Sequence, residues 1–410
     1  MNTQKQLTIG LAAALLGSGA ALADADFVIT GATAFRSAAN QAIIDALDSD
    51  QSHVEVAYID SEGFGSSDRT LIKVAAADAE DPSLDLDDDG FVIVKTSWSG
   101  STGGIAAVAS ATPVQVLDDS TPTSLFSAGG TEATSPEYTT QVARFTFSDV
   151  TQASSTTTDP TLESEPGGVG VIPFAFVATE GAHDAGITSM TPQAFRALYG
   201  GDGTLPLSFF SGDPADEDIT VYGIGRNNSS GTRATMLAET GFGVFNSVTQ
   251  YDFWINPDSD ELEIDFTNEG RPDDVSTGGL FVGTTGYSSS SYVRALLQGT
   301  APDLDEDGDP DFYVIGYIDQ KDVAAAELGG AEALAYAGES FSVDAVREGK
   351  YTLWNYEQFL WPAGLTTAEE AFKTDIVNGI DATLDETKFV KRSTMEVLRT
   401  GDGATVFPID

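Results

Sequence analysis

The chain has 410 residues, no cysteine and a formal net charge of −45 at neutral pH. This length suits two domains with separate cores, and the lack of cysteine excludes disulfides and a lipid-modified cysteine. The acidic balance argues against nucleic acid as a partner, because phosphate backbones are bound through Lys and Arg.

The first 23 residues are expected to be a cleaved secretory signal peptide. Lys5 precedes an apolar run from Leu7 to Leu16, and Ala21 and Ala23 supply small residues for cleavage. A buried first helix is the alternative. No later stretch approaches the roughly 20 apolar residues that span a bilayer. We therefore expect a periplasmic or secreted protein without a lipid anchor and not embedded in a membrane.

Strand-like and helix-like segments alternate along the rest of the chain. Residues 27–35 are rich in β-formers, and residues 36–47 have apolar spacing that suits a helix. The alternation predicts an α/β fold. Residues 148–168 are rich in Ser, Thr and Pro and are expected to form an exposed loop. Further strands are expected at 53–60, 91–98, 169–179 and 218–225, and Thr191 with Pro192 is expected to start a helix.

Three strand-to-helix junctions combine hydroxyls with glycine or a cation. A helix start presents backbone N–H groups without intrahelical partners, and its dipole favours an anion. Each junction alone is typical of an ordinary N-cap, but three in one chain, one of them with an arginine, indicate an anion site. The junctions are ITGATAFRSAA with Thr33 and Ser37, KTSWSGSTGG with Ser99, Ser101 and Thr102, and GRNNSSGTRATML with Arg226 and Ser230 to Thr232.

Three segments resemble a known family in their sequence and order. They are MTPQAFRALYGG, ITVYGIGRNNSSGTRATML and YVIGYIDQKDV. With GATAF near residue 33 and GSTGG near residue 102, they resemble the periplasmic phosphate-binding protein of the phosphate-specific ABC transporter. The resemblance covers most of the chain after residue 23, with several acidic segments inserted.

This resemblance implies a two-lobed periplasmic-binding-protein fold of type II. Each lobe would be a mixed sheet flanked by helices, and a two-crossing hinge would join them. Lobe 1 would comprise residues 24–170 and 352–410, and lobe 2 residues 171–351. The implied function is capture of inorganic phosphate, or a similar oxyanion, for an ABC-transporter permease by a monomeric protein.

The resemblance also implies the residues of the phosphate site. Arg226 would make a two-pronged charged contact, and amides and hydroxyls would supply the other donors. In GATAF, Ala34 separates the threonine and phenylalanine that the family has adjacent, which leaves the local register open. The residues carried over are Thr33, Phe35, Ser101, Asp119, Arg226, Ser230, Gly231 and Thr232.

Asp119 is carried over as the family's carboxylate, with Asp118 as the alternative. A carboxylate can accept a hydrogen bond from the proton that phosphate still carries near neutral pH. Fully ionised sulfate has no such proton and leaves the carboxylate unpaired. Asn228 stands where the family commonly places an acid. The site is therefore expected to bind phosphate with altered selectivity or a different oxyanion.

Two acidic loops, residues 85–91 and 303–311, have the Asp-x-Asp-x-Asp-Gly spacing of the first half of a calcium loop. Thr96 and Val314 stand where an EF-hand has its twelfth-position glutamate, so a complete EF-hand is excluded. A flexible acidic loop is the alternative. No cofactor is required, and any calcium would be structural. The candidate ligands in the second loop are Asp303, Asp305, Asp307, Asp309 and Asp311.

The chain is not expected to be an enzyme. It has two histidines, His53 and His183, and neither a His-Glu-x-x-His helix nor a Gly-x-Ser-x-Gly elbow. The alternative to a transport protein is a secreted acidic interaction or matrix protein with the same fold that no longer binds phosphate.

Overall fold

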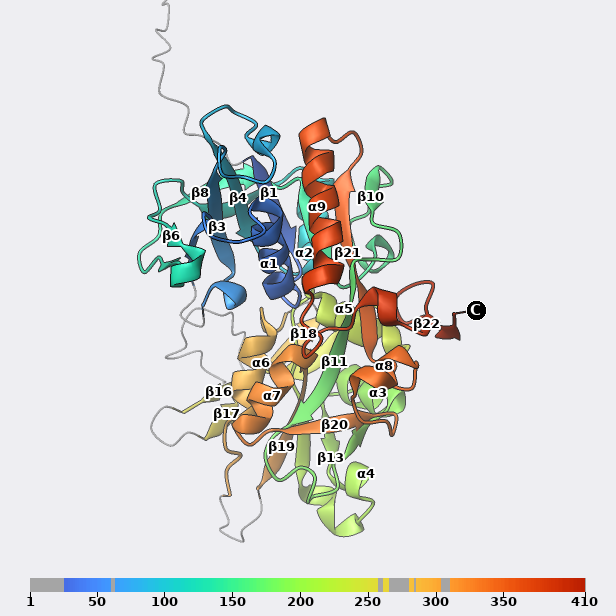
Figure 1. The fold of residues 1–410 in the computed structure, drawn as a ribbon. Coiled ribbons are helices and arrows are strands. Elements are labelled where there is room, and N and C mark those ends of the chain that lie inside the picture. Colours follow the sequence, from blue (N-terminus) through green and yellow to red (C-terminus); the bar gives the residue numbers. More distant parts are fainter. Residues whose placement is uncertain are drawn as a thin grey trace, which may run out of the picture.

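The structure is a computed structural model that describes residues 26–59, 63–256, 261–264, 280–283, 285–303 and 310–409. The expected signal peptide lies outside these ranges, as do Asp305, Asp307 and Asp309 of the second acidic loop. In the described part, a large mixed sheet is flanked by helices (Figure 1). The expected α/β class is therefore confirmed.

The first part of the sheet comes mainly from strands before residue 150. β1 (Phe27–Gly31) runs parallel to β4 (Phe91–Ser97) on one side and to β9 (Phe145–Ser148) on the other. β3 (Arg69–Ala75) and β2 (Glu55–Tyr58) extend the sheet in antiparallel pairing. The short edge strands are β6 (Ser124–Leu125), β7 (Thr131–Glu132) and β10 (Leu162–Ser164).

The second part of the sheet is also mixed. Its order runs from β11 (Gly170–Ala178) through β19 (Phe312–Asp319) and β14 (Thr220–Gly223) to β13 (Thr204–Pro206). β14 and β19 are parallel, whereas β11 and β13 are antiparallel to their neighbours. On the other side of β11 lie β20 (Glu332–Tyr336) and then β12 (Ser189–Met190).

Two long strands join the two parts of the sheet, and both run between them in Figure 1. β11 pairs through residues 170–173 with β21 (Trp354–Pro362) and through residues 174–178 with β19. β21 continues past β11 and pairs with β9 through residues 358–360. The sheet is continuous across these strands, and a hinge at the two crossings stays a prediction.

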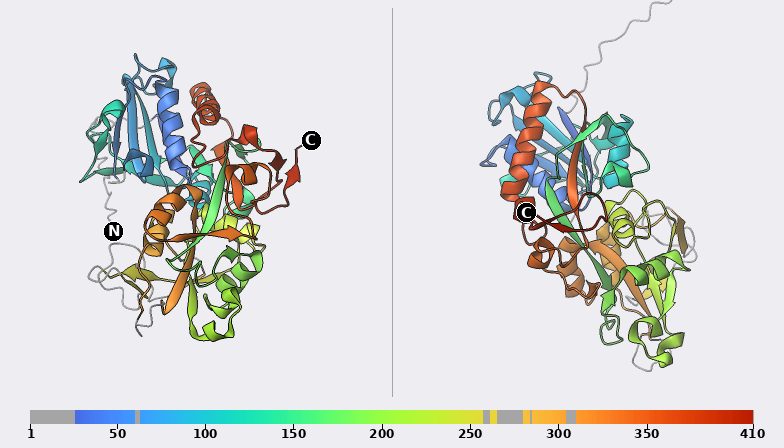
Figure 2. Two further views of the ribbon diagram at one scale, coloured as in Figure 1. Left: turned by 60° about the horizontal axis from the view of Figure 1, so that its bottom comes forward. Right: turned by 90° about the vertical axis from the view of Figure 1, so that its right-hand side faces the viewer.

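The chain after β21 returns to the first part of the sheet. There α9 (Thr367–Thr383) packs beside α1 (Arg36–Leu47), as both views in Figure 2 show. The ring of Phe372 stacks on that of Phe27, with centroids 4.0 Å apart. The remaining helices are α2 (Ser101–Ala109), α3 (Pro192–Gly200), α4 (Ser208–Ser211), α5 (Gly231–Glu239), α6 (Ser290–Leu297), α7 (Gln320–Leu328) and α8 (Val343–Arg347).

Within the described residues, four small two-stranded sheets lie outside the main sheet. They pair β5 (Pro113–Leu117) with β8 (Tyr138–Val142), β15 (Val248–Tyr251) with β18 (Leu280–Gly283), β16 (Phe253–Ile255) with β17 (Leu262–Ile264), and β22 (Val397–Leu398) with β23 (Phe407–Pro408). None of the helices in the described ranges is long and apolar enough to cross a membrane.

Most elements expected from the sequence are confirmed, including the helix start at Thr191, whose side chain accepts a hydrogen bond from the backbone N–H of Ala194. The expected exposed loop at 148–168 is wrong in part. Leu162 is buried in β10, which pairs with β21. Ser154 is also buried, and its hydroxyl donates to the carboxylate of Asp402. The loop is held by these long-range contacts.

Candidate anion site

Strand ends from both parts of the sheet converge at one place. The carboxyl ends of the parallel strands β1, β4 and β9 share one edge of the sheet, the usual location of ligand sites in α/β proteins. Thr33, Ser101 and Asp149 follow these three strands. In the second part, Arg226 follows β14, and Asp319 ends the parallel strand β19.

Arg226 links these strand ends. Its side chain is fully buried, and its guanidinium donates to the hydroxyls of Ser290 at 2.7 Å, Thr33 at 3.3 Å and Thr232 at 3.4 Å. It also donates to the backbone carbonyls of Tyr287 and Ser288. Burial lowers the pKa of Arg226, and the nearby carboxylates of Asp319 and Asp149 oppose that shift.

Several helices begin around the guanidinium. Ser290 is the first residue of α6, Thr232 is the second of α5, and Thr33 lies just before α1. Helix N-termini carry partial positive charge, so an arginine among them makes a strongly anion-attracting environment. Asp319, the N-cap residue of α7, contributes negative charge and accepts a hydrogen bond from the Thr232 hydroxyl at 2.8 Å.

Asp149 is the second carboxylate of the site. It is completely buried, and burial, followed by the charge of Asp319, raises its pKa to about 7. Its backbone N–H donates to the hydroxyl of Ser101 over 3.3 Å. Within the described part of the chain, its Oδ1 atom has no hydrogen-bond partner. This oxygen can therefore accept a hydrogen bond from a ligand oxygen that carries a proton.

Gly231 permits the close approach of these groups. A Cβ at this position would lie 2.0 Å from Oδ1 of Asp149 and 2.3 Å from Oγ of Ser101. Any larger residue would thus push the start of α5 away from both side chains. Gly231 therefore lets the start of α5, which comes after β14, pack against Ser101 and Asp149, which come after β4 and β9.

The structure brings together Thr33, Ser101, Arg226, Ser230, Gly231 and Thr232 of the expected site. Ser230 is buried and caps α5 by accepting from the backbone N–H of Arg233. Phe35 points its ring into the core, 5.7 Å from the ring of Phe147, so only its backbone can face a ligand. Asn228 is exposed, and its backbone carbonyl accepts from the hydroxyl of Thr102.

The structure does not bring Asp119 to this cluster. Its carboxylate lies 2.6 Å from the ammonium of Lys95, a fully buried residue of β4. Asp118 accepts hydrogen bonds from Ser120, which lower its pKa. Both aspartates follow β5, which pairs with β8 and not with β1. The carboxylate beside Ser101 and Arg226 is Asp149 in place of Asp119.

A cavity of about 140 Å³ adjoins the site. Ser230 and Thr102 line it, so it borders the starts of both α5 and α2. The other lining residues are Ser154, Thr156, Asn228, Arg233, Ala234, Leu237, Val244, Phe245, Asn246 and Ser247.

No protein-family model matches the chain, and no curated protein matches it. Solved structures resemble it in shape. A protein of Clostridium perfringens, described as a candidate phosphate ABC transporter substrate-binding protein with bound phosphate, is 13% identical, with a TM-score of 0.46. The match covers 89% of this chain and 98% of that one.

Two further solved structures have a comparable degree of similarity to this chain. An ABC-type phosphate transport receptor of Vibrio cholerae is 12% identical over 89% of this chain and 99% of the other, with a TM-score of 0.44. A protein of Planctomyces limnophilus, described as possibly phosphate-binding, is 12% identical over 90% and 94%, with a TM-score of 0.40. All three TM-scores lie below 0.5, so we base the function on the contacts within this chain.

The sequence offers only a partial signal for Asp149. It comes soon after the strand-like segment FTF of residues 145–147, as Thr33 and Ser101 come after their strands. What the sequence does not show is that β9 pairs in parallel with β1. Ser290 and Asp319 are not predicted by the sequence either, because no motif marks them as part of a site.

Only some of the expected calcium ligands lie within the described residues. Asp303 and Asp311 are described, whereas Asp305, Asp307 and Asp309 are not. In the first acidic loop, Asp85 and Asp87 lie with Asp26, their ligand atoms within 4.8 Å of one another. Burial raises the pKa of Asp26 to about 6.

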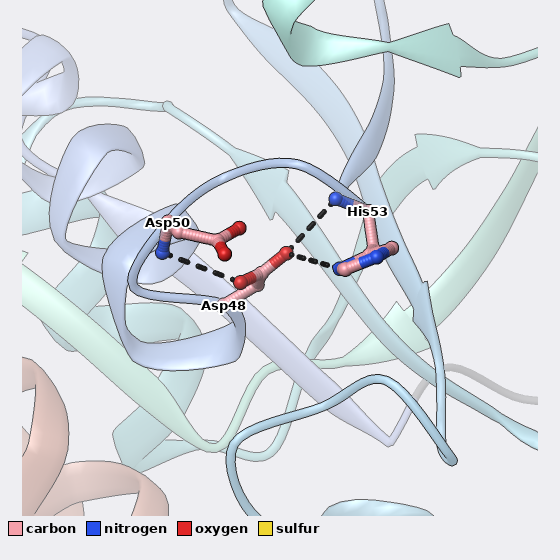
Figure 3. Close-up of side chains that lie close together, drawn as sticks. All are labelled: Asp48, Asp50 and His53. Atoms are coloured by element: carbon pink, nitrogen blue, oxygen red, sulfur yellow. Dashed lines mark hydrogen bonds and ion pairs between the residues drawn. The ribbon is translucent and has the colours of Figure 1, made fainter.

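One more group with metal-ligand side chains lies at the end of α1. Asp48, Asp50 and His53 place their ligand atoms within 4.8 Å of one another (Figure 3). The Asp48 carboxylate accepts from the backbone N–H groups of Asp50 and His53, and lies 3.1 Å from the His53 ring. These hydrogen bonds already account for the close approach, and we assign no ion to the group.

Proposed function

We propose that the protein is an exported solute-binding protein that captures inorganic phosphate, or a closely related oxyanion, and presents it to an ABC-transporter permease. The observation that supports this most is the buried guanidinium of Arg226, which lies among helix N-termini where strand ends from both parts of the sheet meet. Buried positive charge of this kind favours a small anion.

Hydroxyl protons at the site support the same function. Thr33 and Ser290 accept from Arg226, and Ser101 accepts from the backbone of Asp149. Among the described residues, none of these three hydroxyls has an acceptor for its own proton. Each can therefore donate to a ligand oxygen. Together with the positive charge of Arg226, whose N–H groups donate to Thr33 and Ser290, they match the several acceptor lone pairs of a tetrahedral oxyanion.

Asp149 gives this site its selectivity. Phosphate near neutral pH retains an O–H group that can donate a hydrogen bond to an ionised carboxylate. Sulfate has no such group and is repelled. Since the pKa of Asp149 is about 7, the carboxylate is partly ionised near neutral pH and becomes more so as pH rises. Discrimination against sulfate should therefore sharpen above pH 7.

Ligand capture would use the two crossing strands as a hinge. The hydroxyl of Thr102 donates to the carbonyl of Asn228 at 2.8 Å, and its backbone N–H donates to that of Ser229. These contacts join the start of α2 to the loop before α5. In the proposed cycle they form on closure and break on release to the permease.

Equilibrium dialysis with radiolabelled phosphate tests the function after the protein has been unfolded, stripped and refolded. We expect saturable binding of one phosphate per monomer. Arg144→Lys, far from the site in a pair with Glu369, provides a control for a conservative arginine change. A folded protein that binds no phosphate would favour the alternative, a secreted acidic interaction protein. The proposal includes no cofactor, and any bound calcium would have a structural role.

A further inference from the structure

Glu357 lies beside Asp149 in the strand that joins the two parts of the sheet. In the pairing of β21 with β9, Gln358 is opposite Ser148, so the next antiparallel position places Glu357 opposite Asp149. On its other side Glu357 pairs with Gly170, which has no side chain. The two acidic residues are therefore neighbours behind the anion site.

The carboxyl group of Glu357 is buried without a partner. The residue is 0% exposed, and in the described part of the chain neither carboxyl oxygen has a hydrogen-bond partner. Oδ1 of Asp149 lacks a partner as well. Two ionised carboxylates side by side in such a place would carry a very large desolvation and repulsion cost, so one of them holds a proton.

The surrounding charges decide which acid keeps the proton. Burial raises the pKa of Glu357 well above its usual range, and the negative charges of Asp149 and Asp319 raise it further, whereas the nearby backbone N–H of Ser148 opposes the shift. Asp149 is faced by Asp319, Arg226 and Asp402, and the positive charge of Arg226 favours its ionised form. Asp149 therefore ionises first, while Glu357 stays neutral.

We propose that Glu357 is a specificity-determining residue that must carry a proton for the site to accept a doubly charged oxyanion. This inference rests on the proposed function. With neutral Glu357, ionised Asp149 accepts a hydrogen bond from the protonated oxygen of the ligand while Arg226 balances the charge. When Glu357 also ionises, the pair repels the anion, so alkaline pH releases the ligand.

Calorimetric titration with inorganic phosphate from pH 7 to pH 11 compares the wild type with Glu357→Gln, which keeps the shape and cannot ionise. We expect equal affinity within about twofold at neutral pH. As pH rises, the affinity of the wild type should fall at least about tenfold more than that of the variant, because the wild type gains one more buried negative charge beside Asp149. Lys321 and the buried Tyr317 are present in both proteins, so their effects on the pH dependence of affinity cancel in the comparison.

Infrared difference spectroscopy provides a readout that does not need the ligand. At pH 8, ligand-free wild type should show the C=O band of a buried protonated carboxylic acid, and the band should be absent from Glu357→Gln but present in the exposed control Glu137→Gln. The band should fade over the pH range in which phosphate affinity falls.

The outcomes separate the two proposals. Phosphate binding with identical pH profiles in wild type and Glu357→Gln, or a wild type without the infrared band, overturns the role of Glu357 and leaves the proposed function standing. A folded wild type that binds no phosphate at any pH overturns the proposed function and the specificity role together, even where the band is present.

Discussion

The guanidinium of Arg226 donates to the hydroxyl of Thr33 over 3.3 Å, although 193 positions separate the two residues along the chain. Arg226 follows a strand of the second part of the sheet and Thr33 a strand of the first. A ligand between these residues would be held by both parts at once. Movement of one part against the other would then change affinity.

Replacing Arg226 with Lys should weaken phosphate binding by roughly 10- to 100-fold. A charged hydrogen bond contributes about 1.5–3 kcal/mol, and lysine keeps the charge but loses the fork that makes two parallel contacts. Titration calorimetry gives the affinity, and circular dichroism checks the fold. Equal affinity in Arg226→Lys and the control Arg144→Lys would show that Arg226 does not touch the anion.

Replacing Asp149 with Asn should relax selectivity in favour of sulfate. The amide has N–H donors for a fully ionised oxyanion, while the wild-type carboxylate repels it. We expect the ratio of phosphate to sulfate affinity to fall at least tenfold at pH 8. Competition of unlabelled sulfate against labelled phosphate measures this ratio. A variant that still ignores sulfate would assign the discrimination to another residue.

Ligand-free stability should also depend on Asp149. Its pKa is about 7 in the folded protein and 3.8 ordinarily, so between these values the folded state holds more protons than the unfolded state. Its contribution is therefore present in full below about pH 4 and is lost as pH rises through about 7, by up to about 4 kcal/mol. Urea unfolding at pH 5 and pH 8 measures the change. Asp149→Asn should remove part of it, and an unaltered pH dependence in that variant would contradict the assignment.

Gly231→Ala should disrupt the site. The new methyl group would meet Asp149 and Ser101 at distances that no relaxed structure tolerates. Gly379→Ala in α9 is the matched control, since nothing lies within 4 Å of its added Cβ and alanine favours a helix by about 1 kcal/mol. We expect Gly231→Ala to lower both the melting temperature and phosphate affinity, and Gly379→Ala to raise the first and leave the second unchanged.

Local motifs let the sequence predict much of the site. Thr33, Ser101 and the segment from Arg226 to Thr232 stand at strand-to-helix junctions, where hydroxyls and glycine are recognisable within a few residues. The α/β class follows from the same alternation. These features depend on interactions between residues close together in the sequence, so a short segment is enough to predict them.

The carboxylates could not be predicted in this way. The assignment of Asp119 by resemblance fails because β5 to β8 intervene before the chain returns to the parallel strands in β9. Asp149 and Glu357 become neighbours only through the pairing of β9 with β21. Among 64 acidic residues, these two combine burial with carboxyl oxygens that have no hydrogen-bond partner in the described part of the chain, and only the folded protein shows this.

The most direct measurement is calorimetric titration of stripped and refolded wild type at pH 7.5 with phosphate, and in parallel with sulfate. We expect tight binding of one phosphate and much weaker binding of sulfate, because ionised Asp149 accepts a hydrogen bond from an O–H group that only phosphate carries. Absence of phosphate heat from a demonstrably folded sample would contradict the proposed anion site, and equal binding of both anions would contradict the role of Asp149.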